Sequence, residues 1–274
     1  MAGVCDAAVE RAHAAGVSGV LLAGVDAPGW RDAAVLQARL GDRLEMALAY
    51  GVHPEVISEL AGPEPEGAPS RLDEQLTALA RAARGEPLAD GEPPLPRPHA
   101  IGELGLDGRD LGPASPDRLA LQERAFRAQL ALARELELPL VLHVVRAHAQ
   151  ALRILTRDGV PHRGGVVHSY SGSAELVADY LRLGLYISFA GPVTYPEARR
   201  VHAAAQAVPS ERLLVETDAP TQTPWARRPA ACEPAFLPDV LQALALHRGQ
   251  PWAELAAATE TNARRLFHIG KANT

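Results

Sequence analysis

The chain has 274 residues, of which 47% are hydrophobic, and its formal net charge at pH 7 is −6. This length accommodates one large core, and the apolar content excludes an intrinsically disordered protein. No apolar run reaches the roughly 20 residues that a membrane-spanning helix needs, so the sequence predicts no membrane partner. The net negative charge argues against a protein that coats nucleic acid non-specifically.

The scarcity of lysine and cysteine argues against several kinds of catalytic site and against a disulfide-stabilised fold. Lys271 is the single lysine, which argues against a Schiff-base lysine, a pyridoxal phosphate anchor and a phosphate-loop lysine. Cys5 and Cys232 cannot form a disulfide framework, as expected in a reducing cytoplasm. Asp6 and Glu10 lie where a signal peptide would have an apolar run, so we expect a cytoplasmic location.

Short apolar runs alternate with longer amphipathic segments along the chain, which predicts a parallel sheet with helices between its strands. The runs are rich in Val, Ile and Leu, as is typical of strands buried on both faces. The predicted strands are Val17–Val25, Leu44–Tyr50, Ala100–Glu103, Leu138–Val145, Gly165–Ser169, Leu185–Phe189 and Leu213–Asp218.

The segments between these runs have apolar residues at helical spacing. The clearest is Asp117–Glu137, which has Pro116 and Pro139 at its two limits. The predicted helices are Cys5–Ala15, Arg31–Leu40, Arg71–Arg84, Asp117–Glu137, Ala147–Thr156, Ala174–Leu183, Pro196–Ala207 and Pro238–His247.

This order of elements predicts an α/β fold of the TIM (β/α)8 type with the first strand missing, because a helix precedes the first apolar run. The alternative is an open doubly wound sheet, but no Gly-rich phosphate loop follows any predicted strand. We expect one domain over residues 1–274, with Pro/Gly-rich surface loops at 61–70 and 85–98.

Ionisable residues follow the apolar runs at the predicted strand ends. Glu103, His143, His168 and Asp218 each end such a run, and His53 follows another. The carboxyl ends of the strands form the active-site face of a parallel barrel. Imidazole and carboxylate groups converging there suit Zn²⁺, Mn²⁺ or a similar divalent ion. Taken singly, each residue is more often a hydrogen-bonded or solvated loop residue, so only the set predicts a metal-dependent hydrolase.

The motifs around these residues give a more specific indication. In chain order they resemble the boxes of the TatD family of metal-dependent deoxyribonucleases. The motifs are GVHP at 51–54, IGELGLD at 101–107, the helical residues Gln122, Phe126 and Gln129, HSYSG at 168–172, LLVETDAP at 213–220, and Thr261-Asn262 with Leu266-Phe267.

The resemblance implies a TIM barrel with one or two divalent ions (Mg²⁺, Mn²⁺ or Zn²⁺) that hydrolyses phosphodiester bonds. The implied substrate is DNA, typically a single strand degraded from its 3′ end, and no obligate protein partner is evident. Glu103 would be a metal-bridging carboxylate, and His143 and His168 imidazole ligands. Asp218 would be both a ligand and the base that orients the attacking water, and His53 would bind substrate.

Two alternatives keep the same fold. The chain could hydrolyse a small amide or ester, or it could be a degenerate, non-catalytic barrel, since it lacks the strand carrying a His-x-His pair with which most family members open. Arg227 and Arg228 are either a phosphate clamp or solvated loop charges. Trp30, Trp225 and Trp252 are far apart in sequence and predict no stacking platform for a nucleic-acid strand.

Overall fold

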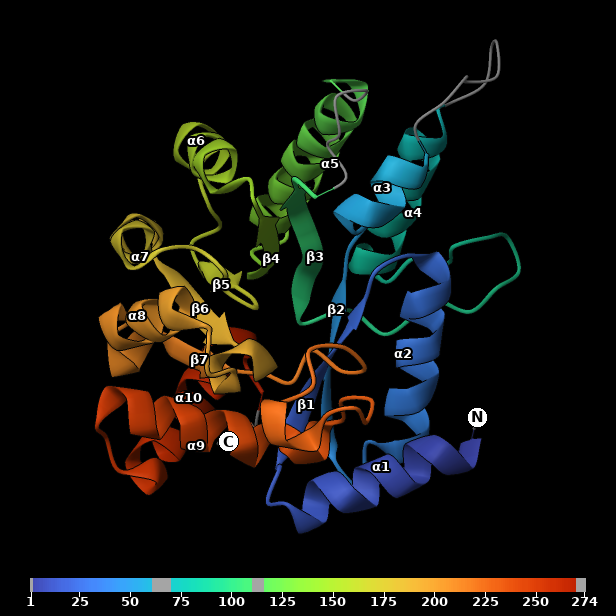
Figure 1. Cartoon of the computed structure of the whole chain (residues 1–274). Helices are drawn as coiled ribbons and strands as arrows, with labels where there is room; N and C mark the ends of the chain where they lie inside the picture. The colour runs from blue at the N-terminus through green and yellow to red at the C-terminus, as the bar shows by residue number, and fades with distance from the viewer. Residues whose placement is uncertain (1, 61–69, 110–115, 270–274) are drawn as a thin grey trace. The chain divides into compact units, whose positions relative to one another are not determined.

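Each strand is followed by one or two helices in most of the computed structural model, which describes residues 2–60, 70–109 and 116–269 (Figure 1). Internal contacts divide the chain into two compact units. Unit 1 comprises Met1–Val20, Leu40–Met46 and Val166–Thr274, and unit 2 comprises Leu21–Arg39 and Ala47–Gly165. Of the predicted site residues, His53, Glu103 and His143 belong to unit 2, and His168 and Asp218 belong to unit 1.

All seven predicted strands are present, with small differences at their ends. The third strand continues to Asp107 instead of ending at Glu103, and the seventh ends at Val215 before the acidic residues that follow it. The strands are β1 (Gly19–Gly24), β2 (Glu45–Tyr50), β3 (Ala100–Asp107), β4 (Leu140–Val145), β5 (Gly165–Val167), β6 (Leu185–Phe189) and β7 (Leu213–Val215).

The predicted helices are also present, and two further helices were not predicted. Pro54–Glu59 is too short for a periodic signal, and Trp252–Phe267 has a middle rich in alanine and threonine that weakens its periodicity. The helices are α1 (Ala2–Ala14), α2 (Ala27–Leu40), α3 (Pro54–Glu59), α4 (Arg71–Arg84), α5 (Pro116–Glu135), α6 (His148–Asp158), α7 (Ala174–Arg182), α8 (Arg199–Ala207), α9 (Leu237–Arg248) and α10 (Trp252–Phe267). Short 3₁₀ turns are η1 (Gly191–Thr194), η2 (Ser210–Arg212), η3 (Trp225–Arg227) and η4 (Pro234–Phe236).

In unit 2 the strands neighbour one another in the order β1, β2, β3, β4. The registered pairs, β2 with β3 and β3 with β4, are parallel, as predicted from the alternation of elements. Within the second pair, Gly102 lies opposite Val141 and Leu104 opposite Leu142, so the register shifts at Glu103. Such a bulge turns a side chain out of the regular alternation of the strand, and bulges are frequent next to active sites.

Two buried glutamines of α5 fix the ends of strands in unit 2, where this helix lies beside β3 (Figure 1). Gln122 accepts a hydrogen bond from the Asp107 amide at 2.9 Å. Gln129 accepts from the Val52 amide at 2.8 Å and donates to the Val52 carbonyl oxygen at 3.1 Å. The two glutamines therefore hold the backbone beside His53 and at the end of β3, which explains their place in the motif set.

In unit 1 the strand order is β5, β6, β7, and the registered pair β6–β7 is parallel. The buried side chain of Asn262, on α10, donates to the carbonyl oxygens of Leu213 at 2.9 Å and Ser210 at 2.7 Å. Its amide group carries two N–H donors and so can bond both carbonyl oxygens at the start of β7. Leu266 and Phe267 at the end of α10 are buried in the core.

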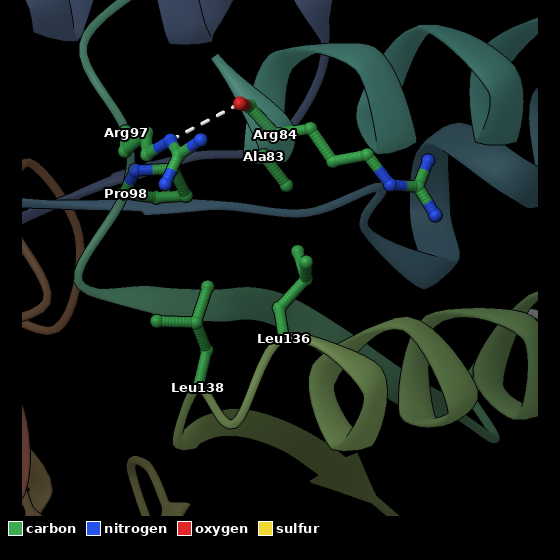
Figure 2. Close-up of a pocket in the computed structure, with 6 residues that line it drawn as sticks. All are labelled: Ala83, Arg84, Arg97, Pro98, Leu136 and Leu138. Carbon is green, nitrogen blue, oxygen red and sulfur yellow. Dashed lines mark hydrogen bonds between the residues drawn. The ribbon is translucent and has the colours of Figure 1, made fainter.

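The segment at 85–98 contains no helix or strand, as predicted, whereas residues 61–69 of the other predicted loop lie outside the described residues. Figure 2 shows a pocket beside this segment, lined by Ala83, Arg84, Arg97, Pro98, Leu136 and Leu138. In it, Arg97 Nε donates to the Arg84 carbonyl oxygen at 3.0 Å. Leu138 precedes β4, so the pocket lies at the amino end of that strand, and the predicted site residues do not line it.

None of the helices in the described ranges combines the length and apolar character needed to cross a membrane.

Candidate metal centre

Three predicted site residues meet in unit 2. His53 follows β2, Glu103 lies at the bulge of β3, and His143 lies near the end of β4. His53 Nε2 is 3.1 Å from His143 Nδ1 and 3.5 Å from Glu103 Oε2, and His143 Nδ1 is 3.9 Å from Glu103 Oε2. One donor atom from each residue lies within 4.8 Å of the others. The structure thus brings together three of the residues that the sequence singled out.

The hydrogen bonds of His53 determine which of its ring nitrogens carries the proton. His53 is the N-cap of α3, and its Nδ1 accepts from the Glu55 amide at 3.2 Å. A neutral His53 therefore carries its proton on Nε2, the atom that faces His143 and Glu103. In this state His53 is a hydrogen-bond donor toward the cluster, not a source of a lone pair.

His143 has the complementary arrangement. Its Nδ1 accepts from His53, so its own proton lies on Nε2, which donates to Asp107 Oδ2 at 3.0 Å. A carboxylate behind an imidazole in this way fixes the orientation and the tautomer of the ring, as it does behind histidine ligands of metals. His143 Nδ1 is accordingly the imidazole atom best prepared to bind a cation, which would take the place of the hydrogen bond from His53 and leave His53 Nε2–H free to donate elsewhere.

Sequence reasoning did not identify Asp107 as a site residue, although it ends the IGELGLD motif and β3. The side chain is fully buried. Burial by itself raises the pKa of Asp107, but hydrogen bonds from His143 and Arg109 outweigh that effect and hold the pKa well below its ordinary value. Asp107 is therefore a carboxylate that faces His143 on one side and Arg109 on the other.

We expect Asp107→Asn to weaken Mn²⁺ binding by roughly 10- to 100-fold, the range typical of groups that orient a metal ligand. It should also change the acid sensitivity of the metal-free protein. Because the pKa of Asp107 is lower in the folded state than in the unfolded state, its stabilisation is present above about pH 4 and declines as the pH falls further. Below about pH 4, the free energy of unfolding of the Asp107→Asn variant should therefore fall less steeply than that of the unmodified chain. Calorimetric titration with Mn²⁺ and urea unfolding at several pH values measure both effects.

Asp90→Asn is the matched control, since Asp90 is exposed on the 85–98 loop of the same unit. It should bind Mn²⁺ like the unmodified chain. Equal Mn²⁺ affinities for the Asp107 and Asp90 variants would show that Asp107 does not orient a ligand.

The close approach of β3 to β4 explains the second glycine of the same motif. Gly105 lies opposite His143 in the register and has a φ of +146°. A Cβ at this position would overlap the His143 carbonyl oxygen and lie 3.0 Å from the His143 carbonyl carbon. Only glycine fits this conformation without displacing the strand that carries His143.

His168 and Asp218 lie directly beyond strands of unit 1. His168 follows β5 and is buried, with its Nδ1 3.8 Å from Glu216 Oε1. Glu216 also accepts a hydrogen bond from the backbone amide of Ser169. Asp218 follows β7 and has a φ of +56°, a conformation that aspartate tolerates better than most residues. The structure therefore places both predicted residues in loops that follow strands, as expected.

Gln222 orients Asp218, and sequence reasoning missed it. Its side-chain amide donates to Asp218 Oδ2, while its Oε1 accepts from the Ser169 hydroxyl at 2.7 Å. The loop is held close to the end of β6, since a Cβ on Gly191 would collide with the Gln222 carbonyl oxygen. A loop glutamine gives no periodic signal, so only the folded backbone reveals this contact.

The donor chemistry fits a divalent ion. Imidazole nitrogen and carboxylate oxygen are ligands that Zn²⁺ and Mn²⁺ both accept, and the carboxylate behind His143 is the usual support for such a ligand. Glu103 Oε2 and His143 Nδ1 supply this pair in unit 2, and His168 and Asp218 are donors of the same kinds in unit 1.

Comparison with known proteins identifies relatives along nearly the whole chain. The family model described as TatD related DNase matches residues 3–268. A protein named 3'-5' ssDNA/RNA exonuclease TatD from Citrobacter rodentium is 37% identical, with 96% of this chain and 92% of that protein covered. An uncharacterized metal-dependent hydrolase, YabD of Bacillus subtilis, is 31% identical, with 95% of this chain and 91% of that protein covered.

Solved structures agree on the fold. The crystal structure of YJJV, a TatD homologue from Escherichia coli K12, has a TM-score of 0.81 and 28% sequence identity. The match covers 98% of this chain and 93% of that one. Together with seven strands that alternate with helices, it confirms the predicted α/β fold of the TIM-barrel type.

Proposed function

Because the chain belongs to the TatD-related DNase family of metal-dependent hydrolases, which act on ester bonds, we propose that it is a 3′–5′ exonuclease for single-stranded DNA. The observation that carries the proposal is the pair of donors in unit 2, Glu103 and His143, the latter backed by a buried carboxylate. Relatives that match over nearly their whole length are named as exonucleases for single-stranded DNA and RNA.

The proposal assigns a role to each residue. Glu103, His143, His168 and Asp218 are the ligands of one or two divalent ions. Asp218 also accepts a proton at its carboxylate from the attacking water, which must lie within hydrogen-bond reach. His53 donates from Nε2 to a phosphate oxygen of the substrate, a role that suits the tautomer imposed by its capping bond.

A divalent ion, when bound, supplies Lewis acidity toward the phosphate group. The remaining contributions come from the chain. Asp107 holds His143 in one tautomer, and Gln222 holds the Asp218 carboxylate in one orientation. Such preorganisation means that little rearrangement is needed during the reaction. The proposal includes Mg²⁺, Mn²⁺ and Zn²⁺ as candidate ions, since the donor set is compatible with each of them.

The test is degradation of single-stranded DNA labelled at either the 3′ or the 5′ end. We expect cleavage with Mg²⁺, Mn²⁺ or Zn²⁺, none with EDTA, and immediate release of the 3′ label while the 5′-labelled strand shortens stepwise. Duplex DNA of the same sequence should be degraded more slowly. Separate assays with RNA and with small acyl esters establish the substrate class.

Two variants are the controls for this assay. Glu103→Gln removes the charge of a proposed ligand and should abolish cleavage, whereas Glu254→Gln changes an exposed carboxylate of α10 and should leave it intact. Release of the 5′ label first would contradict the proposed polarity. Efficient turnover of acyl esters without any cleavage of DNA would replace the nuclease by a small-molecule hydrolase.

The proposal extends to organisation and location. We take residues 1–274 as one catalytic domain, because the family match runs through segments of both units. We place the enzyme in the cytoplasm, since Cys5 and Cys232 are both free thiols, as is usual in a reducing compartment.

A further inference from the structure

Two aromatic residues that are distant in sequence meet in unit 1 beneath an arginine. The ring centroids of Tyr195 and Trp225 are 6.1 Å apart, with an interplanar angle of 60°. The guanidinium carbon of Arg228 lies 5.5 Å from the Tyr195 ring centroid and 5.7 Å from that of Trp225. These three side chains form what we call the aromatic patch. The aromatic patch was not predicted from sequence, where the spacing of the three tryptophans was compared and the spacing of Trp225 from Tyr195 was not.

The aromatic patch is open to solvent. Trp225 is 54% exposed, which is unusual for so large an apolar side chain, and Arg228 is exposed as well. The neighbouring Arg227 is paired with Asp239 at 2.7 Å. Within the described parts of the chain, by contrast, Arg228 forms no salt bridge with a carboxylate, and its guanidinium lies over the Tyr195 and Trp225 rings. Its charge is therefore available to an anion.

Hydrogen bonds join the aromatic patch to the loop that carries Asp218. Tyr195 Oη donates to the Thr223 carbonyl oxygen at 3.0 Å, and the Trp225 amide donates to Thr194 Oγ1 at 2.8 Å. This loop follows β7 and carries both Asp218 and Gln222, and the Gln222 amide donates to the Asp218 carboxylate. The patch is thus anchored to one of the proposed catalytic residues by a short, well-fixed segment.

We propose that the aromatic patch is a stacking platform for an unpaired nucleobase, with Arg228 contacting the adjoining phosphate. This proposal rests on the proposed function and specifies how the substrate is bound. An exposed indole offers a flat face that accepts any base, and a guanidinium above an aromatic pair supplies a cation without a competing carboxylate. The platform favours single strands, because bases in a duplex are already stacked on their neighbours.

Binding of a short oligothymidylate, measured by fluorescence anisotropy in EDTA, tests the platform without any turnover. We expect Trp225→Ala to weaken binding by about 5- to 150-fold, which corresponds to roughly 1–3 kcal/mol for the loss of one stacked base. Trp225→Phe retains a ring and should bind with intermediate affinity. Trp252→Ala is the matched control, because Trp252 is also exposed (43%) but lies on α10.

A strand of the same length with abasic sites in place of its bases separates stacking from charge. It should bind weakly, and the Trp225 variants should bind it no less tightly than the unmodified chain does. Arg228→Ala should weaken binding of both strands, since both carry phosphates.

The outcomes separate this proposal from the proposed activity. If oligothymidylate binds the Trp225→Ala and unmodified chains equally, or binds neither, the platform is overturned whether or not the chain cleaves DNA. Trp225-dependent binding without cleavage under any metal would support the platform and overturn the exonuclease. An equal loss of affinity in the Trp225→Ala and Trp252→Ala variants would also overturn the platform.

Discussion

Replacing His143 with alanine is expected to lower the rate of metal-dependent cleavage at least about a hundredfold. The expected loss exceeds the roughly 10- to 100-fold typical of groups that only orient a ligand, because His143 Nδ1 is itself a proposed ligand atom. The substitution also removes the donor that Asp107 faces and the acceptor that His53 faces. Initial rates on 3′-labelled single-stranded DNA and Mn²⁺ titration measure the two consequences.

The alanine variant should still fold, because His143 lies at the rim of the core and its strand is otherwise apolar. Circular dichroism and urea unfolding verify this. His162→Ala is the control, since His162 is an exposed histidine of the same unit. If the folded His143→Ala protein cleaved DNA and bound Mn²⁺ as the control does, His143 would have no role in a metal centre.

Replacing Gly105 with alanine is expected to destabilise the protein by roughly 3–5 kcal/mol. The new methyl group would overlap the carbonyl oxygen of His143, and the positive φ is one that L-residues rarely adopt. Total stabilities of natural domains are about 5–15 kcal/mol, so a loss of this size removes a large fraction of the free energy of unfolding. Urea unfolding monitored by circular dichroism gives the free energy of unfolding.

Gly91→Ala separates backbone strain from steric overlap. Gly91 also has a positive φ, of +83°, but nothing lies within 4 Å of a Cβ built on it. This variant should lose only about 1–2 kcal/mol, the cost of the left-handed conformation. If Gly105→Ala and Gly91→Ala lowered the free energy of unfolding equally, steric overlap with β4 would not be a cause of the loss at Gly105.

The strands could be predicted from sequence because their residues are almost all apolar, whereas the segments between them are rich in charged residues. The ends were less certain, since β3 continues past Glu103 to Asp107 and β4 continues past His143 to Val145. Glu103 and His143 were singled out because several ionisable residues follow apolar runs in the same way, a pattern that single hydrogen-bonded or solvated loop residues do not explain. Gln122 and Gln129 were identified only as parts of a motif. The structure gives their physical reason, which is the pairing of backbone groups that would otherwise be buried without partners.

Other features depend on contacts that no local pattern encodes. Asp107 looked like the end of a motif, and its role became evident only when β4 brought His143 beside it. Gln222 lies in a loop without periodicity. Tyr195 and Trp225 are separated by a helix and a strand, so their contact follows from the fold of unit 1 and not from spacing.

The hydrogen bonds around His143 close into a ring. Glu55 accepts from Arg109 at 2.8 Å, Arg109 Nε donates to Asp107 at 2.9 Å, and Asp107, His143 and His53 lead back to the amide of Glu55. In a closed ring, the energetic effects of two substitutions do not add, because the first already releases the partners of the second. The exposed carboxylate of Glu55 is consequently coupled to a buried imidazole, so a change at the protein surface reaches the orientation of a group that solvent barely contacts.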